Sequence, residues 1–444
     1  SKVYGSDITT DELFIRHTYL AQFTRLIGYA SLLNRQSDMP DKYEELEAIL
    51  DGTAFEQFGI GNISENDFYS WVLLPEIRDE ALSAFFTLIN HLIVYDLKQI
   101  DQDLLKQLYQ NLVDPTTRHD LGEYYTPDWL AELILHEIDY NAPKSLYDPA
   151  CGSGTFLFTA IKRLIKLGVQ GEALVKFCMN NIMGTDVHPL AVTIARVNYL
   201  LALSKEMQTT SAHRQGYSIP VYMADAMIKP EQGQSGVSLQ LPINGEHSEA
   251  SQIWRRNFIL LTDLKSQDRN GIWAYILKNL MRPMIFAQDK FDVIVGNPPW
   301  LSYRYIRNAD YQQDVKTIYQ HYNLISKKDV KLFTQMDLST LFFMIARDRY
   351  LKAGGTIAFV MPRAVITGAK QHRPFQQIGF SRILDMEKVT PLFNVPSCVM
   401  IQQGTLYTDK IPTKTYKAKL PKHEMELDEA RLFLLERDSQ TSFV

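Results

Sequence analysis

Residues Asn297 to Trp300 form the tetrapeptide Asn-Pro-Pro-Trp, which could bind a planar ring that carries an amino group. The Asn297 side-chain carbonyl and the Pro298 backbone carbonyl can each accept a hydrogen bond, and Trp300 offers a flat aromatic face. A planar ring with an exocyclic amine is an adenine or a cytosine. The same residues could instead form a turn after a core strand, with a tryptophan that packs inside, and four residues alone do not separate the two interpretations.

The tetrapeptide directly follows residues 291–296, a short apolar run rich in β-branched side chains that predicts a buried strand. The two prolines end this strand because they cannot continue its hydrogen-bond ladder. Open α/β sheets bind their ligands at the carboxyl ends of the strands. We therefore expect the tetrapeptide to face a ligand crevice.

Three further predicted strands each end in an aspartate, namely Asp148, Asp186 and Asp225. The first strand runs into a glycine loop and then a helix, and Gly152 and Gly154 let the backbone of that loop approach a ligand. A carboxylate at this first strand end favours a cationic amine and would repel a pyrophosphate. The second aspartate precedes another helix, where a carboxylate can bind two ribose hydroxyls. The pattern predicts a nucleoside site with a cationic group near Asp148.

A helix is predicted upstream, within residues 121–140, with Thr126 as its N-cap and Pro127 in its first turn. Tyr124 and Tyr125 lie on the loop that leads into it. Because the amino end of a helix attracts anions, this loop could bind a carboxylate. The alternative is a capped helix with aromatic packing at its entry.

Together these motifs resemble the S-adenosylmethionine-dependent N6-adenine DNA methyltransferases of restriction-modification systems. The segments that carry the resemblance are GEYYTP, DPACGSGTF, GTDVHPLAVTIARVNYLLAL, the Ala-Asp pair at 224–225 and GNPPWLSY. Their order, with the glycine loop before the Asn-Pro-Pro-Trp loop, is that of the gamma arrangement in this family. The acidic helical segment at the N-terminus also looks like the helical connector of single-chain restriction-modification enzymes.

The resemblance implies an α/β fold, with a Rossmann-like methyltransferase sheet that ends in an antiparallel hairpin and follows an α-helical domain. Two apolar segments, SRILDM and SCVMIQQ, have the spacing of that hairpin. We expect a helical domain at 1–118, a methyltransferase domain at 119–409 with a polar insertion at 226–290, and a charged C-terminal tail at 410–444. A DNA target-recognition domain is expected to be missing from the chain.

The family's reaction is transfer of a methyl group to the N6 amine of an adenine that is flipped out of double-stranded DNA. The resemblance assigns this chemistry to Asn297, Pro298, Pro299 and Trp300. The two carbonyls would draw the amine hydrogens out of the ring plane and free the nitrogen lone pair, and Trp300 would stack on the base. Such a mechanism needs no metal and no covalent nucleophile.

The resemblance also implies S-adenosyl-L-methionine as the cofactor. Its ribose would bind Asp186, its adenine amine would face Asp225, and its methionine end would bind Asp148 and the Tyr125–Thr126 loop. The residues expected at the cofactor are Tyr124, Tyr125, Thr126, Pro127, Asp148, Pro149, Ala150, Gly152, Gly154, Thr155, Phe156, Asp186, Val187, Asp225, Ala226 and Asn297.

Three other interpretations compete with an active adenine methyltransferase. The chain could be a modification subunit that methylates DNA only with a separate specificity subunit or recognition domain. It could methylate a protein glutamine or an RNA amine, because those enzymes use a similar loop. It could also be a DNA-binding module without catalysis, although the intact loop and cofactor motifs argue against lost activity.

Composition and charge limit the partners. Residues 1–120 hold 20 acidic and 9 basic side chains, whereas residues 301–382 hold 13 basic and 5 acidic ones, so a basic segment follows the Asn-Pro-Pro-Trp loop. Such a segment suits a polyanion, although a solvated charged face is the alternative. The three cysteines show no CxxC pair, which argues against a zinc site and a disulfide framework. No run of about 18 apolar residues is present, so we expect a cytoplasmic protein without a membrane partner.

Overall fold

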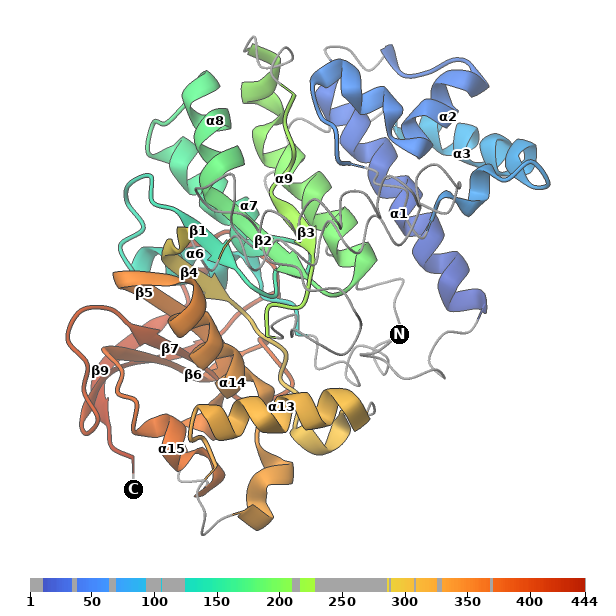
Figure 1. The fold of residues 1–444 in the computed structure, drawn as a ribbon. Helices are drawn as coiled ribbons and strands as arrows, with labels where there is room; N and C mark the ends of the chain where they lie inside the picture. Colours follow the sequence, from blue (N-terminus) through green and yellow to red (C-terminus); the bar gives the residue numbers. More distant parts are fainter. Residues whose placement is uncertain are drawn as a thin grey trace, which may run out of the picture.

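A computed structural model describes residues 11–33, 38–63, 69–92, 105, 124–209, 216–227, 286, 289–306, 309–325, 330–367 and 370–443 (Figure 1). The insertion expected at 226–290 lies outside these ranges, apart from residues 226, 227, 286, 289 and 290. None of the helices in the described ranges is long and apolar enough to cross a membrane.

The described strands form one nine-stranded sheet with the order β3-β2-β1-β4-β5-β7-β6-β8-β9. Strands β1 to β5 are parallel to one another, and β7 runs antiparallel between β5 and β6, so the predicted final hairpin is confirmed. The strands are β1 (Leu146–Asp148), β2 (Ile182–Asp186), β3 (Val221–Met223), β4 (Phe291–Gly296), β5 (Leu351–Pro362), β6 (Arg382–Thr390), β7 (Ser397–Gln402), β8 (Ile411–Lys419) and β9 (Leu435–Thr441).

Helices cover both faces of the sheet, as the alternation of side chains along β4 requires. Val293 and Val295 belong to one buried cluster, whereas Ile294 belongs to the cluster on the opposite face. The first face carries α6 (Asp128–Glu137), α7 (Thr155–Lys166), α8 (Gly171–Asn181), α9 (Pro189–Thr209) and α16 (Leu427–Arg431). The second face carries α13 (Ala309–His321), α14 (Leu338–Ile345) and α15 (Arg373–Gln376) (Figure 1).

The N-terminal helices pack directly on the methyltransferase part. They are α1 (Asp11–Leu32), α2 (Tyr43–Asp51) and α3 (Arg78–Leu92), and α1 lies along α9 (Figure 1). The two helices approach closely at Gly28, where an added Cβ atom would lie 3.1 Å from both methyl groups of Val197. Side chains such as Leu20 and Leu26 join the same buried cluster as α9. The expected helical domain at 1–118 therefore has no separate core in the part that the structure describes.

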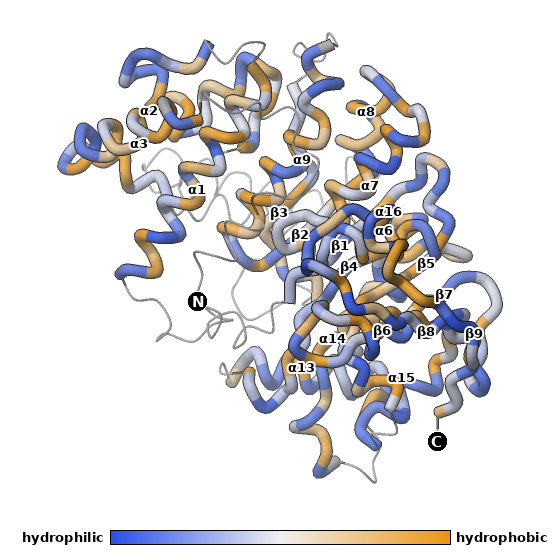
Figure 2. The backbone as a smooth tube through the Cα atoms, turned by 180° about the vertical axis from the view of Figure 1, so that it is seen from behind, coloured by the Kyte–Doolittle hydropathy of each residue, from blue (hydrophilic) through white to orange (hydrophobic). Residues whose placement is uncertain are grey.

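The C-terminal segment differs from the expected tail at 410–444. Strand β8 pairs with β6, and β9 pairs with β8, so both strands extend the sheet. The composition of the segment did not predict strand β9, because β9 is an exposed edge strand and its residues are mostly polar (Figure 2). Strand β8, in contrast, alternates, and it buries Ile411, Thr413, Tyr416 and Ala418.

A buried carboxylate ties this extension to α6. Glu137, which is 7% exposed, accepts hydrogen bonds from Arg382 Nη1 (2.8 Å), Lys414 Nζ (2.9 Å) and the Tyr416 hydroxyl (3.1 Å). Burial by itself raises the pKa of Glu137, but its bonds to Lys414 and Tyr416 and the charge of Arg382 lower that pKa below its usual value. The ionised side chain therefore holds α6, β6 and β8 together.

Candidate active site

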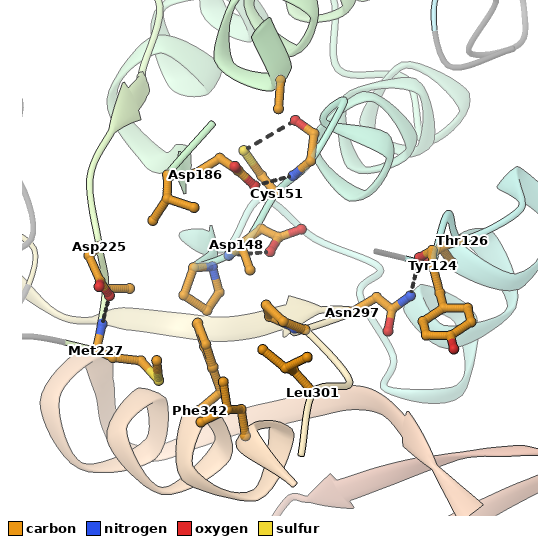
Figure 3. Close-up of a pocket in the computed structure, with 18 of the residues that line it drawn as sticks. Tyr124, Thr126, Asp148, Cys151, Asp186, Asp225, Met227, Asn297, Leu301 and Phe342 are labelled. Atoms are coloured by element: carbon orange, nitrogen blue, oxygen red, sulfur yellow. Dashed lines mark hydrogen bonds between the residues drawn. The ribbon is translucent and has the colours of Figure 1, made fainter. Parts of the chain in front are cut away.

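The candidate site lies at the point of the sheet where the order of successive strands reverses. The chain builds β1, moves outward through β2 and β3, and then returns to place β4 on the other side of β1. Because β1 to β4 are parallel, their carboxyl ends meet at one edge and leave a crevice beside β1. A cavity of about 170 Å³ opens at this edge (Figure 3).

Most of the predicted site residues meet in this cavity. The ones that line it are Tyr124, Tyr125, Thr126, Asp148, Pro149, Ala150, Gly152, Thr155, Phe156, Asp186, Val187, Asp225, Ala226, Asn297 and Pro299. Four predicted residues do not line it: Pro127, Gly154, Pro298 and Trp300. The predicted helix after Thr126 begins one position later than expected, because Pro127 is the N-cap and α6 starts at Asp128.

Asp148 is a buried carboxylate at the end of β1, with only 1% of its surface exposed. Its Oδ1 atom accepts a hydrogen bond from the backbone N–H of Ala150 (3.1 Å), and no basic side chain among the described residues pairs with it. A Cβ atom on Gly296 would lie 2.6 Å from the same oxygen, so the glycine at the end of β4 makes room for the carboxylate. Burial raises the pKa of Asp148 well above its usual value. A cationic group beside Asp148 would offset the desolvation cost of the ionised carboxylate.

The two glycines of the loop after β1 have different roles, one at the cavity and one in helix packing. Gly152, at a φ of +53°, donates its backbone N–H to Asp186 Oδ2 (2.9 Å) and lines the cavity. Gly154, at a φ of +85°, is the N-cap of α7 instead. A Cβ atom there would lie 3.1 Å from the Cβ of Ala195, so Gly154 lets α7 approach α9.

Asp186 ends β2, whereas Asp225 lies two residues after the end of β3, and both carboxylates are already oriented. Asp186 Oδ1 accepts from the backbone N–H of His188 (2.8 Å), and Asp225 Oδ1 accepts from that of Met227 (2.8 Å). Burial raises the pKa of Asp186, and its bonds to backbone N–H groups, among them Gly152, act in the opposite direction. Each carboxylate oxygen has more than one lone pair, so a carboxylate that accepts from a backbone N–H can also accept from a ligand hydroxyl or amine.

Asn297 leaves β4 with its carboxamide held in one orientation. Its Nδ2 atom donates to the backbone carbonyl of Tyr124 at 2.6 Å. Its Oδ1 atom is buried and has no hydrogen-bond partner among the described residues. The two tetrapeptide neighbours differ, because Pro299 lines the same cavity and Pro298 does not. A buried carbonyl without a donor is costly, and a ligand N–H would satisfy it.

Trp300 packs inside the protein, which differs from the predicted open face. The side chain is 8% exposed, and its Nε1 atom donates to the backbone carbonyl of Val360 at 3.3 Å. The Tyr124 ring stacks on the Trp300 ring, with centroids 4.6 Å apart and an interplanar angle of 30°. The Phe393 ring meets Trp300 edge-on at 4.9 Å. Because Tyr124 covers one face, Trp300 supports the loop in this structure and does not present that face to a ligand.

The apolar side of the cavity was not predicted from the sequence. Leu301 follows the tetrapeptide, and Leu338 and Phe342 come from α14 (Figure 3). The signal for the helix pair was present, because the two residues are four positions apart and follow Asp337, whose Oδ1 accepts from the Ser339 N–H (2.9 Å) as an N-cap. Cys151, Ser153, Ala191, Met227, Tyr305, Ile306 and Tyr311 also line the cavity.

The strand order, the glycine loop and the cavity at the switch point define a Rossmann-like methyltransferase fold. Residues 180–393 match the family described as Eco57I restriction-modification methylase, and residues 100–232 match the family described as N-6 DNA Methylase. The predicted resemblance to N6-adenine DNA methyltransferases of restriction-modification systems is thereby confirmed.

Curated relatives carry the same kind of name. The chain is 29% identical over 216 residues to the adenine-specific methyltransferase PglX of Streptomyces coelicolor, a match that covers 45% of this chain and 16% of the relative. It is 23% identical over 192 residues to the type I restriction enzyme MjaVII methylase subunit of Methanocaldococcus jannaschii, covering 43% of this chain and 29% of that subunit. The chain thus spans less than a third of the length of either relative.

Two solved structures share the fold. The chain in a DrdV–DNA complex aligns with a TM-score of 0.52 and 16% identity, covering 92% of this chain and 43% of that one. The type IIL restriction-modification enzyme MmeI, solved in complex with DNA, aligns with a TM-score of 0.51 and 13% identity, covering 98% of this chain and 61% of that one. At these identities the likeness concerns the fold.

Proposed function

We propose that this chain transfers a methyl group from S-adenosyl-L-methionine to the N6 amine of an adenine in double-stranded DNA, as part of a restriction-modification system. The observation that carries the proposal is the Asn297 carboxamide. Its buried Oδ1 atom lacks a donor among the described residues, and Asn297 lines one cavity with Asp148, Asp186 and Asp225, so an amine could bind there beside a nucleoside-like cofactor.

The described residues fit the cofactor. S-adenosyl-L-methionine would supply a methyl group on a sulfonium, which is a good electrophile at neutral pH. Asp186 and Asp225 present carboxylate oxygens to this cavity, which suit the ribose hydroxyls and the adenine amine as hydrogen-bond acceptors. Asp148, a buried carboxylate without a basic partner among the described residues, suits the α-amino group, and the cavity-lining residues Tyr125 and Thr126 would hold the methionine end.

The amine needs activation because its lone pair is delocalised into the ring. Asn297 Oδ1 would accept one amine hydrogen, and this bond would strengthen as the nitrogen becomes pyramidal and positively charged in the transition state. The Pro298 carbonyl, the second acceptor that the resemblance implies, belongs to a residue that does not line the cavity in this structure. The apolar side chains of Leu301 and Phe342 line the cavity and would contact a planar base without hydrogen bonding to it.

Covalent methylation of cytosine C5 is disfavoured by the cysteines. Such chemistry needs a thiolate. Cys151 lines the cavity, but burial and the nearby Asp186 and Asp148 carboxylates raise the pKa of its thiol well above the usual value. Burial also raises the pKa of Cys178 and Cys398, and neither residue lines the cavity.

Partner-dependent methylation is the second candidate, favoured by the similarity to a type I methylase subunit. In this version the chain holds the reacting groups, and a specificity subunit or recognition domain supplies the base-edge contacts. The basic side chains Arg304, Lys316 and Lys331, all on the segment that follows the tetrapeptide, would contact phosphates in either version. Arg307, Lys327 and Lys328 of the same predicted segment lie outside the described residues.

The decisive experiment follows a labelled methyl group. The protein is incubated with methyl-labelled S-adenosyl-L-methionine and duplex DNA that contains many different sites, and the DNA is digested to nucleosides. Label in N6-methyladenine supports the proposal. Label in a cytosine derivative, or label in added protein or RNA but not in DNA, contradicts it. Activity that appears only with a specificity subunit selects the second candidate.

A further inference from the structure

We infer that Tyr124 is a positioning residue, which holds the Asn297 carboxamide so that its Oδ1 atom faces the substrate amine. The inference deepens the proposed function and rests on it. It concerns a residue that contacts neither reacting atom in the scheme above. Two sets of contacts and the place of Tyr124 in the chain support it.

The first contact is the hydrogen bond from Asn297 Nδ2 to the Tyr124 carbonyl, at 2.6 Å. A carboxamide can turn by half a rotation and exchange its oxygen and nitrogen. In the exchanged orientation Asn297 Oδ1 would face the Tyr124 carbonyl oxygen, and two acceptors repel each other. The carbonyl therefore selects the orientation in which the amide oxygen can accept from an amine.

The second set of contacts fixes that carbonyl in space. The Tyr124 ring stacks on Trp300 at 4.6 Å and lies 6.2 Å from Phe393 at an angle of 83°. Trp300 is itself tied to β5 through its hydrogen bond to the Val360 carbonyl. The position of the Tyr124 backbone thus depends on its side chain, which packs against two residues distant in sequence.

The third feature is the place of Tyr124 in the chain. It lies directly before Tyr125 and Thr126, which line the cavity and face the cofactor side in the proposal, and it also lines the cavity itself (Figure 3). A single short segment before α6 therefore contacts both the loop that holds the amine acceptor and the region proposed for the methionine end.

Tyr124→Ala removes the aromatic anchor, and Tyr124→Phe keeps it. At saturating cofactor we expect Tyr124→Ala to lower the single-turnover rate of methyl transfer by about 30-fold, because misplacement of a reacting partner is costly. Its cofactor affinity should change by less than about threefold, and Tyr124→Phe should keep its rate within about threefold of wild type. The control is Tyr407→Ala, a partly exposed tyrosine outside the cavity, which should behave as wild type.

A wild-type rate in Tyr124→Ala would overturn the inference, as would an equal loss in Tyr124→Phe, which would assign the effect to the hydroxyl group. If Tyr124→Ala melts below the assay temperature, Tyr124→Leu, which keeps apolar volume, replaces it in the same comparison.

A second measurement does not depend on activity. The side-chain amide of Asn297 gives an NMR signal in protein labelled with ¹⁵N-asparagine, and Asn297→Ala assigns it by its loss. We expect this signal to stay in place in Tyr124→Phe and to move in Tyr124→Ala; an unmoved signal would overturn the inference. If the wild type does not methylate adenine at all, the proposed function fails, and this measurement still decides whether Tyr124 orients Asn297.

Discussion

The two halves of the cavity are built in different ways. In the half proposed to bind the cofactor, Asp148, Asp186 and Asp225 each accept a backbone N–H from within two residues, and Asp186 accepts a second one from the neighbouring glycine loop. In the half proposed to bind the base, Asn297 Nδ2 donates to the backbone carbonyl of Tyr124, which is 173 positions away. Each carboxylate of the first half is thus oriented mainly by its own segment, whereas the Asn297 side chain is held by a segment that is distant in sequence. We expect the first half to set affinity and the second to set the rate.

The largest expected effect is that of Asn297→Ala. Loss of one acceptor that acts on the transition state should lower the rate of methyl transfer by about 10²- to 10³-fold. Cofactor affinity, measured by calorimetry, should stay within about threefold of wild type, because the residue acts in the other half. Asn297→Asp is the matched control of similar size, and it should lose rate as well, since its carboxylate cannot donate to the Tyr124 carbonyl. If Asn297→Ala lost cofactor affinity together with its rate, the two halves would not have separate roles.

The next effect concerns Trp300 and separates packing from base stacking. Trp300→Ala should lower the free energy of unfolding by about 3 kcal/mol, because the ring is buried against Tyr124, Phe393 and β5. Trp300→Phe keeps aromatic packing and should cost less than about 1.5 kcal/mol in chemical denaturation. A Trp300→Ala protein with wild-type stability that has lost methyl transfer would favour the base-stacking role expected from the sequence.

Asp186→Ala tests the cofactor half. Removing a carboxylate that binds ribose hydroxyls should weaken S-adenosyl-L-methionine by at least about tenfold, equivalent to the loss of one charge-assisted hydrogen bond. Calorimetric titration measures this directly, and Asp409→Ala on the distant β7–β8 connection is a charge-matched control. If affinity is unchanged, the cofactor does not lie across the ends of β1 to β3.

Asp148→Asn gives the smallest effect and a defined pH dependence. The folded-state pKa of this acid is raised, so it stabilises the free protein below its unfolded pKa, and that contribution is lost as pH rises through the folded pKa. The free energy of unfolding of the cofactor-free wild-type protein should therefore fall as pH rises through the folded-state pKa of Asp148. The free energy of unfolding of Asp148→Asn should fall less over the same range. Cofactor affinity of the wild type should fall as pH drops, since the α-amino group binds the ionised carboxylate. Thermal melts and titrations between pH 5 and 8 test both; identical pH profiles for the two proteins would contradict this role.

The same contrast explains what the sequence could predict. The strand ends Asp148, Asp186 and Asp225 were predictable because each motif is continuous in the chain. The orientation of Asn297 was not, because it depends on a carbonyl from another motif, and Trp300 was predicted to be open because its neighbours Tyr124 and Phe393 are distant in sequence. The strand at 435–441 was missed since an exposed edge strand keeps a polar composition. The strand at 411–419 is an inner strand whose buried residues alternate, so its pattern was present in the sequence and was overlooked.

The most direct test of the division between the halves compares Asp186→Ala and Asn297→Ala as cofactor concentration rises. Single-turnover methyl transfer to duplex DNA is measured for both variants from low to saturating S-adenosyl-L-methionine. We expect Asp186→Ala to approach the wild-type rate at saturation, because only binding is impaired, and Asn297→Ala to stay slow at every concentration. Recovery of Asn297→Ala at saturation, or a persistent defect in Asp186→Ala, would contradict this expectation.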